Sequence, residues 1–170
     1  MFLIGATQKV QNELKRDIVL YEDYAENELN QWHVNLFKKG RYKCLIFIHD
    51  ASLYTVVIPK VRKEHFKNIE QVFLQKLHEN LISDRFSEDH INQIISMGDE
   101  IVFTKTRSRS VIGCIVDQMK MIEYGFESVK EFSPDETAEI NQFINRTPYS
   151  PLYKSEGQPV KELMKYLSDF

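Results

Sequence analysis

The segment from Thr104 to Ser110 combines residue types that recognise anions in proteins. It follows the apolar run of a predicted strand and precedes the apolar positions of a predicted helix, so we expect it to form the turn between them. The first turn of a helix offers free backbone N–H groups and the positive end of the helix dipole. Arginine adds a planar fork of donors that suits phosphate and carboxylate. The candidate ligand-binding residues of this turn are Thr104, Thr106, Arg107, Arg109 and Ser110.

The same turn has an alternative interpretation without a ligand. A serine would cap the helix, and the two arginines would lie in solvent or pair with the acidic segment Glu22–Glu28. Gly113 favours a close contact, because a glycine inside an apolar helix costs about 1 kcal/mol relative to alanine. That contact is either a ligand or a strand packed on the helix.

His33 and Asn35 form a second polar pair, on the strand predicted from the alternation of Trp32, Val34 and Leu36 with polar neighbours. On an open face, the pair would hydrogen-bond a ligand; on a covered face, it would be a satisfied buried pair. If the chain catalyses a reaction, we expect phosphoester chemistry, with His33 as the general base and Arg109 stabilising negative charge.

A basic turn lies between two predicted strands, where Lys38, Lys39, Arg41 and Lys43 alternate with aromatic residues. Cations mixed with aromatic rings are typical of surfaces that bind nucleic acids. A basic hairpin tip can also simply keep a protein soluble, without binding a ligand. Both interpretations stay open at this point.

No other cluster points to a specific reaction. His49-Asp50 has the residue types of a catalytic pair, but Asp is common at the start of a turn, and we favour that role. Cys44 and Cys114 lie in apolar runs without ligand spacing, which predicts free thiols. The remaining histidines lack a ligand-type partner four residues away, and no nucleotide or zinc motif occurs. We therefore predict neither a bound metal nor a cofactor.

The composition is that of a folded domain. The chain has 170 residues, of which 42% are hydrophobic and 12% aromatic, and its net charge is −3. This size fits one domain, with a core over residues 1–145 and a C-terminal wrap and helix over 146–170. The charge balance argues neither for nor against nucleic acid. Because the N-terminal apolar stretch is short and lacks a basic region, we expect a cytoplasmic protein with no membrane association.

Periodicity predicts an α+β fold with a mixed, mainly antiparallel sheet. Short turns at Lys38–Arg41 and Asp50–Ser52 predict a three-stranded antiparallel meander over Trp32–Ile58. Ser133, Pro134 and Glu136 have the spacing of a capping box. Further strands are expected at residues 2–4, 18–21 and 100–106, and helices at about 8–16, 63–82, 87–98, 108–123, 134–145 and 160–167.

Three blocks of sequence resemble a family of small bacterial proteins described only as a domain of unknown function. The blocks are Trp32–Leu36, Lys43–Asp50 and the pattern Thr104-x-Thr106-x-x-Arg109-Ser110-Val111-x-Gly113, which continues to Asp117. Family members more often have Ser-Met-Asn-Asp at positions 114–117, whereas this chain has Cys-Ile-Val-Asp. The resemblance supports the choice of site residues without implying an activity, and it associates some relatives with mobile elements.

We therefore expect a bacterial protein that binds a phosphate-bearing ligand, a nucleotide or a nucleic acid, between the Thr104–Ser110 turn and the face of His33 and Asn35. The alternative is a protein-interaction module without chemistry, similar to an antitoxin or a mobile-element accessory protein. Such a module would bind a protein partner through the acidic segment Tyr21–Glu28 or the basic hairpin.

Overall fold

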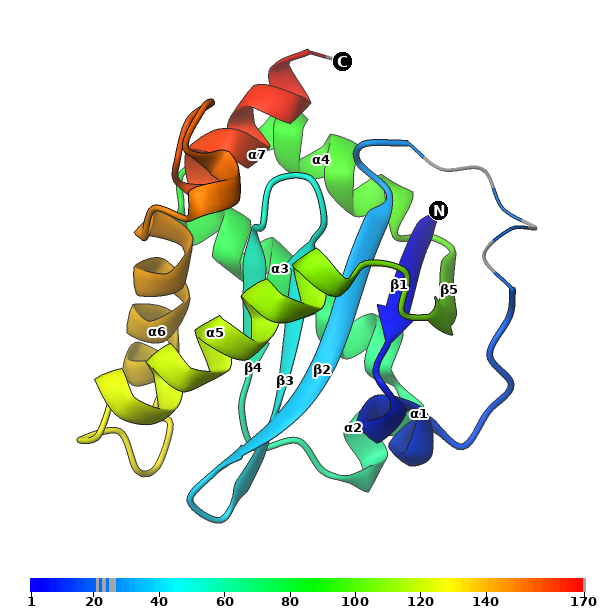
Figure 1. Ribbon diagram of the computed structural model, residues 1–170, viewed down its shortest axis with the longest axis vertical. Coiled ribbons are helices and arrows are strands. Elements are labelled where there is room, and N and C mark those ends of the chain that lie inside the picture. Colours follow the sequence, from blue (N-terminus) through cyan, green and yellow to red (C-terminus); the bar gives the residue numbers. More distant parts are fainter. Residues whose placement is uncertain (21, 23, 25–26, 170) are drawn as a thin grey trace.

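The computed structural model describes residues 1–20, 22, 24 and 27–169. A five-stranded sheet lies between two layers of helices (Figure 1). Its strands are β1 (Phe2–Ala6), β2 (Gln31–Lys39), β3 (Tyr42–His49), β4 (Thr55–Ile58) and β5 (Ile101–Lys105). The helices are α1 (Gln8–Leu14), α2 (Lys63–Lys67), α3 (Ile69–Ser83), α4 (Glu88–Met97), α5 (Arg109–Gly125), α6 (Pro134–Arg146) and α7 (Pro159–Ser168), with a short 3₁₀ turn, η2, at Ser150–Leu152.

The strand order is β4-β3-β2-β1-β5, and the sheet is mixed. The pairs β2–β3 and β3–β4 are antiparallel, which confirms the predicted meander and the α+β class. The two pairs made by β1, with β2 and with β5, are parallel. Long connections with helices separate these parallel strands along the chain, as a crossover requires.

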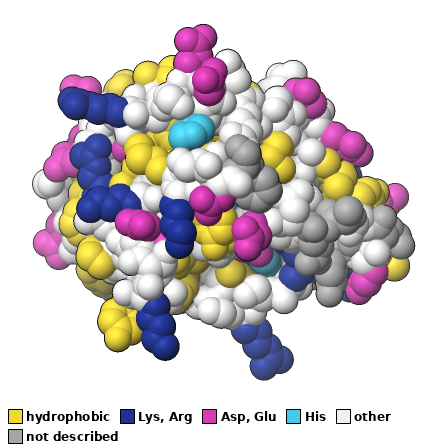
Figure 2. Space-filling view, turned by 90° about the horizontal axis from the view of Figure 1, so that it is seen from above, with side chains coloured by type: hydrophobic (Ala, Val, Ile, Leu, Met, Phe, Trp, Pro, Cys, Tyr) yellow, Lys and Arg dark blue, Asp and Glu magenta, His cyan; other side chains and the backbone are white. Residues whose placement is uncertain are grey.

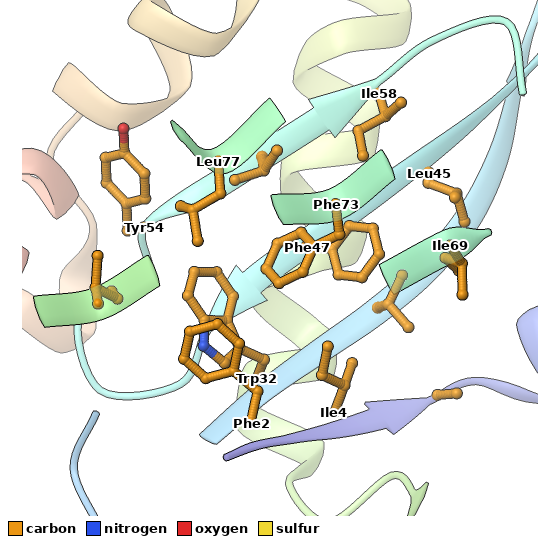
Figure 3. Packing of buried hydrophobic residues seen from close by; sticks show 14 of the residues in the cluster. Phe2, Ile4, Trp32, Leu45, Phe47, Tyr54, Ile58, Ile69, Phe73 and Leu77 are labelled. Carbon is orange, nitrogen blue, oxygen red and sulfur yellow. The ribbon is translucent and has the colours of Figure 1, made fainter. Parts of the chain in front are cut away.

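Each face of the sheet has its own apolar core. On one face Phe73 of α3 stacks on Phe47 with ring centroids 4.1 Å apart, and Trp32 meets Phe73 edge-on at 5.0 Å (Figure 3). Trp32 is fully buried there, as its alternation with Val34 predicts. Helices α5 and α6 cover the other face, where Ile46 and Ile48 belong to the core.

Two asparagines of α6 cover the edge strand β4. Oδ1 of Asn141 accepts from the N–H of Val57 at 2.8 Å and its Nδ2 donates to the same residue's carbonyl at 3.2 Å. Asn145 makes the equivalent pair with Thr55, at 2.7 and 2.8 Å. These side chains satisfy backbone groups that an edge strand would otherwise expose to another chain.

Several predicted boundaries were wrong for local reasons. The helix expected at 63–82 is broken at Asn68, which separates α2 from α3. The strand expected at 18–21 is reduced to a single bridge from Val19 to Thr104, and Tyr21 lies outside the described residues. The third strand of the meander begins at Thr55, because Leu53 adopts φ +61° in the preceding turn. The capping box at Ser133 is confirmed.

Candidate functional site

The sheet register places two predicted site residues, His33 and Thr104, in one row with Gly5. Gly5 of β1 is level with His33 of β2 on one side and with Thr104 of β5 on the other. A Cβ atom at Gly5 would lie 2.7 Å from Cδ2 and Nε2 of His33 and 3.2 Å from Nη1 of Arg107. The imidazole and the guanidinium therefore lie directly over a glycine, and a side chain there would displace them.

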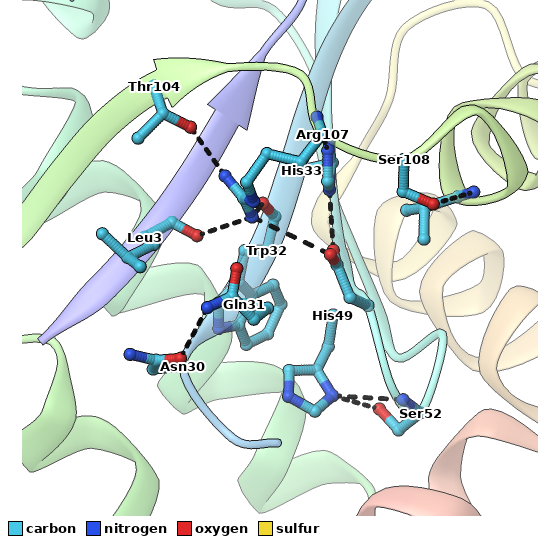
Figure 4. Close-up of polar contacts among 12 residues, drawn as sticks. Leu3, Asn30, Gln31, Trp32, His33, His49, Ser52, Thr104, Arg107 and Ser108 are labelled. Atoms are coloured by element: carbon cyan, nitrogen blue, oxygen red, sulfur yellow. Dashed lines mark hydrogen bonds and ion pairs between the residues drawn. The ribbon is translucent and has the colours of Figure 1, made fainter. Parts of the chain in front are cut away.

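The His33 ring has a partner on each nitrogen (Figure 4). Nε2 accepts a hydrogen bond from the backbone N–H of Arg107 at 3.0 Å. The ring proton is therefore on Nδ1, which donates to Oδ1 of Asp50 at 2.7 Å. The side chain of His33 is fully buried, whereas that of Asp50 is 20% exposed.

The guanidinium of Arg107 is also held by the sheet. Nη1 donates to Oγ1 of Thr104 at 2.6 Å, and Nη2 donates to the carbonyls of Trp32 at 3.0 Å and Leu3 at 3.4 Å. Nη2 lies 3.8 Å from Oδ2 of Asp50. The side chain of Arg107 is only 7% exposed. Its contacts hold the loop after β5 against β1 and β2.

This network brings together only part of the predicted site. His33, Thr104 and Arg107 converge, but Thr106, Arg109 and Ser110 are exposed. Helix α5 is capped by Ser108, whose Oγ accepts from the N–H of Val111 at 3.2 Å, rather than by Ser110. The arginine that meets the threonine hydroxyl is Arg107, and not Arg109, which we expected to stabilise negative charge.

Neither Asn35 nor Gly113 belongs to the network around His33. Oδ1 of Asn35 accepts from Oγ1 of Thr7 at 2.9 Å, and its Nδ2 faces Sδ of Met119 at 3.5 Å. Asn35 is therefore a buried polar residue with its own partners, separate from those of His33. A Cβ at Gly113 would meet nothing within 4 Å, so the close contact inferred there was wrong.

His49 and Asp50 also do not form a catalytic pair. Nδ1 of His49 lies 2.7 Å from Oγ of Ser52 inside the turn, and burial lowers the pKa of His49 to about 4. The carboxylate of Asp50 points away to His33 and Arg107, instead of bonding its own turn as we expected. In the described part of the chain, no three His, Cys, Asp or Glu residues are grouped so that they could hold a metal ion.

The buried network offers little scope for catalysis. A general base needs a free lone pair within reach of its substrate. The acceptor nitrogen of His33 is engaged by a backbone N–H, and no part of the ring is exposed. The arrangement fixes the loop at 104–108.

A different group of cations surrounds an accessible hollow beside the tip of the β2–β3 hairpin. We call it the hairpin hollow; its volume is about 540 Å³, and it is lined by Arg41, Tyr42, Lys43, Lys60, Val61 and Arg62. One wall is β3, and the other is the segment after β4, which is fixed to β3 by a hydrogen bond from the N–H of Val61 to the carbonyl of Lys43 at 3.0 Å. Lys60 adopts φ +58°, a conformation that is uncommon for a residue with a side chain.

Tyr42 organises one side of this hollow. Its ring lies under the guanidinium of Arg41, 5.0 Å from the ring centroid, and under Nζ of Lys60 at 5.4 Å. Its hydroxyl donates to Oε2 of Glu131 at 2.7 Å and accepts from Nη2 of Arg41 at 2.8 Å. The hydrogen bond from Tyr42 and the charge of Arg41 lower the pKa of Glu131, which therefore stays ionised beside the hollow.

The hairpin hollow has more positive charge than its acidic neighbours neutralise. Lys43 pairs with Glu13 at 2.8 Å, and Arg41 pairs with Glu131 at 3.3 Å. Within the described residues, neither Lys60 nor Arg62 forms an ion pair. Residues 36–67 carry eight Lys or Arg and two Asp or Glu, so this segment is +6 in a chain whose net charge is −3.

The family of the protein is shown by its sequence. A family model described as a domain of unknown function, DUF6933, matches residues 3–162. The chain belongs to the DUF6933 family. No curated protein and no solved structure matches the DUF6933 chain.

The residues of the DUF6933 chain that sequence reasoning missed are Lys60 and Arg62. The basic turn at Lys38–Lys43 was recognised, but the second wall of the hollow comes from the segment after Pro59. An available signal was the antiparallel meander itself, because it returns the end of β4 to the start of β3. No helix in the described ranges combines the length and the apolar character that crossing a membrane would require.

Proposed function

We propose that this protein binds a phosphate-bearing ligand, a nucleotide or a nucleic acid, in the hairpin hollow. The observation that carries the proposal is the convergence of Arg41, Lys43, Lys60 and Arg62 on one cavity of about 540 Å³. This volume lies within the range of small-molecule sites, roughly 300–1,000 Å³. Charge-assisted hydrogen bonds from such cations are among the stronger polar contacts a protein makes.

The hairpin hollow supports this function better than the turn at Thr104–Ser110. Ligand binding requires donors that are accessible and not already committed. Arg107 is nearly buried and bonds to a hydroxyl and to backbone carbonyls, whereas Arg62 is exposed. The proposal is binding without a chemical step by His33, since both of its ring nitrogens are engaged.

The alternative of a protein-interaction module has less support. Docking surfaces of that kind present a contiguous apolar patch. The exposed large apolar side chains among the described residues are Leu20, Ile82, Val116, Tyr124, Phe143 and Tyr153, and no helix or strand carries more than two of them. The acidic segment 21–28 includes four residues outside the described part of the chain, namely Tyr21, Asp23, Ala25 and Glu26.

Calorimetric titration with pyrophosphate and with ATP tests the proposal. We expect saturable binding that the double variant Lys60→Gln/Arg62→Gln weakens at least tenfold, because glutamine keeps the side-chain bulk and removes the charge. The matched control is Lys154→Gln/Lys161→Gln, which removes two exposed charges, one on α7 and one in the segment before it. Equal loss in the control, or no binding of either ligand to the wild type, would contradict the proposal.

A further inference from the structure

The hairpin hollow is the first of three hollows that adjoin one another. A second, of about 480 Å³, lies between α1 and the hairpin and shares Lys43 with the first. A third, of about 310 Å³, lies between the end of α1 and α2 and shares Glu13 with the second. The two shared residues, Lys43 and Glu13, form an ion pair with a distance of 2.8 Å. Their lining residues belong to α1, α2, the hairpin and the segment after β4. The ribbons of α1, α2 and the hairpin tip lie at the lower end of the molecule in Figure 1.

The charged residues that line these three hollows are almost all of one sign. Glu13 is the single acidic residue that lines them in the described part of the chain. The basic ones are Lys9, Lys15, Lys38, Arg41, Lys43, Lys60, Arg62, Lys63 and Lys67.

Other surfaces of the molecule are mixed in charge. The cavity beside Asp84 is lined by Lys76 together with Glu79 and Asp84. On the face at the opposite end, basic and acidic side chains are interspersed (Figure 2). The single-sign lining is therefore a feature of the three adjoining hollows and not of the whole surface.

We infer that the ligand is a single-stranded nucleic acid whose phosphates follow the three hollows from the hairpin, past α1, to α2. This inference rests on the proposed function and names its ligand class. Each hollow by itself is large enough for a small ligand, and a mononucleotide would leave two of the three unoccupied. A flexible polyanion can place phosphates beside cations in all of them.

The shape of the surface favours a single strand over a duplex. The cations line three separate hollows beside the hairpin, α1 and α2, and a duplex is too stiff to enter all three. A single strand bends easily, and positively charged grooves that track its backbone are the usual means of binding it.

Recognition should depend on the backbone rather than on the bases. Stacking on an aromatic ring is the common way to hold a base in such grooves. Two cations, Arg41 and Lys60, already contact the ring of Tyr42, and Phe37 is only 7% exposed, so neither ring is well placed to stack on a base. We therefore expect little base preference and a strong dependence on salt, with a log–log slope of about −4 if roughly six phosphates are neutralised.

Fluorescence anisotropy with labelled oligothymidylates of about 4, 8 and 16 nucleotides tests the inference, since these lengths span the usual site sizes. We expect affinity to rise at least tenfold from the shortest to the longest. The variant Lys9→Gln/Lys38→Gln/Lys63→Gln/Lys67→Gln, which leaves Lys60 and Arg62 intact, should lower affinity for the longest strand at least tenfold and leave pyrophosphate binding unchanged. The control Arg85→Gln/Lys154→Gln/Lys161→Gln/Lys165→Gln removes the same charge from exposed residues elsewhere.

The outcomes separate the two proposals. If pyrophosphate binds but affinity for oligonucleotides does not depend on length or on the quadruple variant, the inference fails and the proposed function stands. If a duplex, an acidic polypeptide or vesicles with anionic lipids bind as tightly as the single strand, with the same loss in the variant, the single-strand assignment is wrong. If no probe binds, both proposals fail.

Discussion

The backbone N–H of Arg107 donates to Nε2 of His33 at 3.0 Å, and the side chain of the same arginine reaches the carbonyl of Trp32 at 3.0 Å. One residue thus ties the loop after β5 to two consecutive residues of β2, across the intervening strand β1. Asp50 completes the link from the end of β3. The polar residues at this edge of the sheet therefore fix how four strand ends are placed relative to one another.

Removing the Arg107 side chain should destabilise the fold. We expect Arg107→Ala to lower the free energy of unfolding by about 3 kcal/mol, because it leaves buried carbonyls and the Asp50 carboxylate without their cation. Arg109→Ala, which changes an exposed residue two positions away, should stay within about 0.5 kcal/mol. Urea denaturation of both variants measures the difference, and equal losses would show that Arg107 does not hold the loop after β5 to the sheet.

The close approach at Gly5 predicts an asymmetry between two glycines. Gly5→Ala should cost about 1–3 kcal/mol, because the new methyl group must displace the buried His33 ring. Gly113→Ala should instead stabilise the protein by up to about 1 kcal/mol, since the site on α5 is open and alanine favours a helix. Thermal unfolding distinguishes the two, and a stabilising Gly5→Ala would be inconsistent with the packing of His33.

His49 should make stability depend on pH. Burial lowers its pKa from 6.5 to about 4, so the unfolded state binds more protons between these values, and stability falls as the pH drops from 6.5 to 4. The contribution lost by pH 4 is about 3 kcal/mol. In His49→Asn, where Oδ1 can still accept from the N–H of Ser52, the fall over this window should be smaller by that amount. An unchanged pH profile of the unfolding free energy would refute the role of His49.

The asparagines on α6 should contribute strongly to the stability of the fold, because they pair with the backbone of β4. Asn141→Ala leaves the buried N–H and carbonyl of Val57 without partners, which should cost about 2–4 kcal/mol. Glu139→Ala, on the exposed side of the same helix, serves as the control and should change stability little. Amide hydrogen exchange at Val57 provides a second readout, and protection that survives the substitution would argue against the pairing.

Much of the fold follows from local patterns in the sequence. The meander was predictable because its turns are too short for a crossover, and the burial of Trp32 followed from its alternation with Val34. The capping box at Ser133 was predictable because it depends on three residues close in sequence.

The polar contacts were harder to predict because they depend on register between distant strands. Whether Arg107 or Arg109 turns inward is decided by where β5 ends beside β1, and no local pattern encodes that. Asn141 and Asn145 are spaced as a helix face, but their role requires knowing that β4 is an edge strand. Lys60 and Arg62 join the hairpin cations only through the pairing of β4 with β3.

The most direct test of the central claim is a titration of the ¹⁵N-labelled protein with an oligothymidylate of about 16 nucleotides, followed by amide chemical shifts. We predict that the largest changes map to residues 41–43 and 60–62 and to α1 and α2, and that residues 104–110 change little. Changes concentrated at 104–110, or none at saturating oligonucleotide, would contradict the assignment of the binding surface to the hairpin end of the molecule.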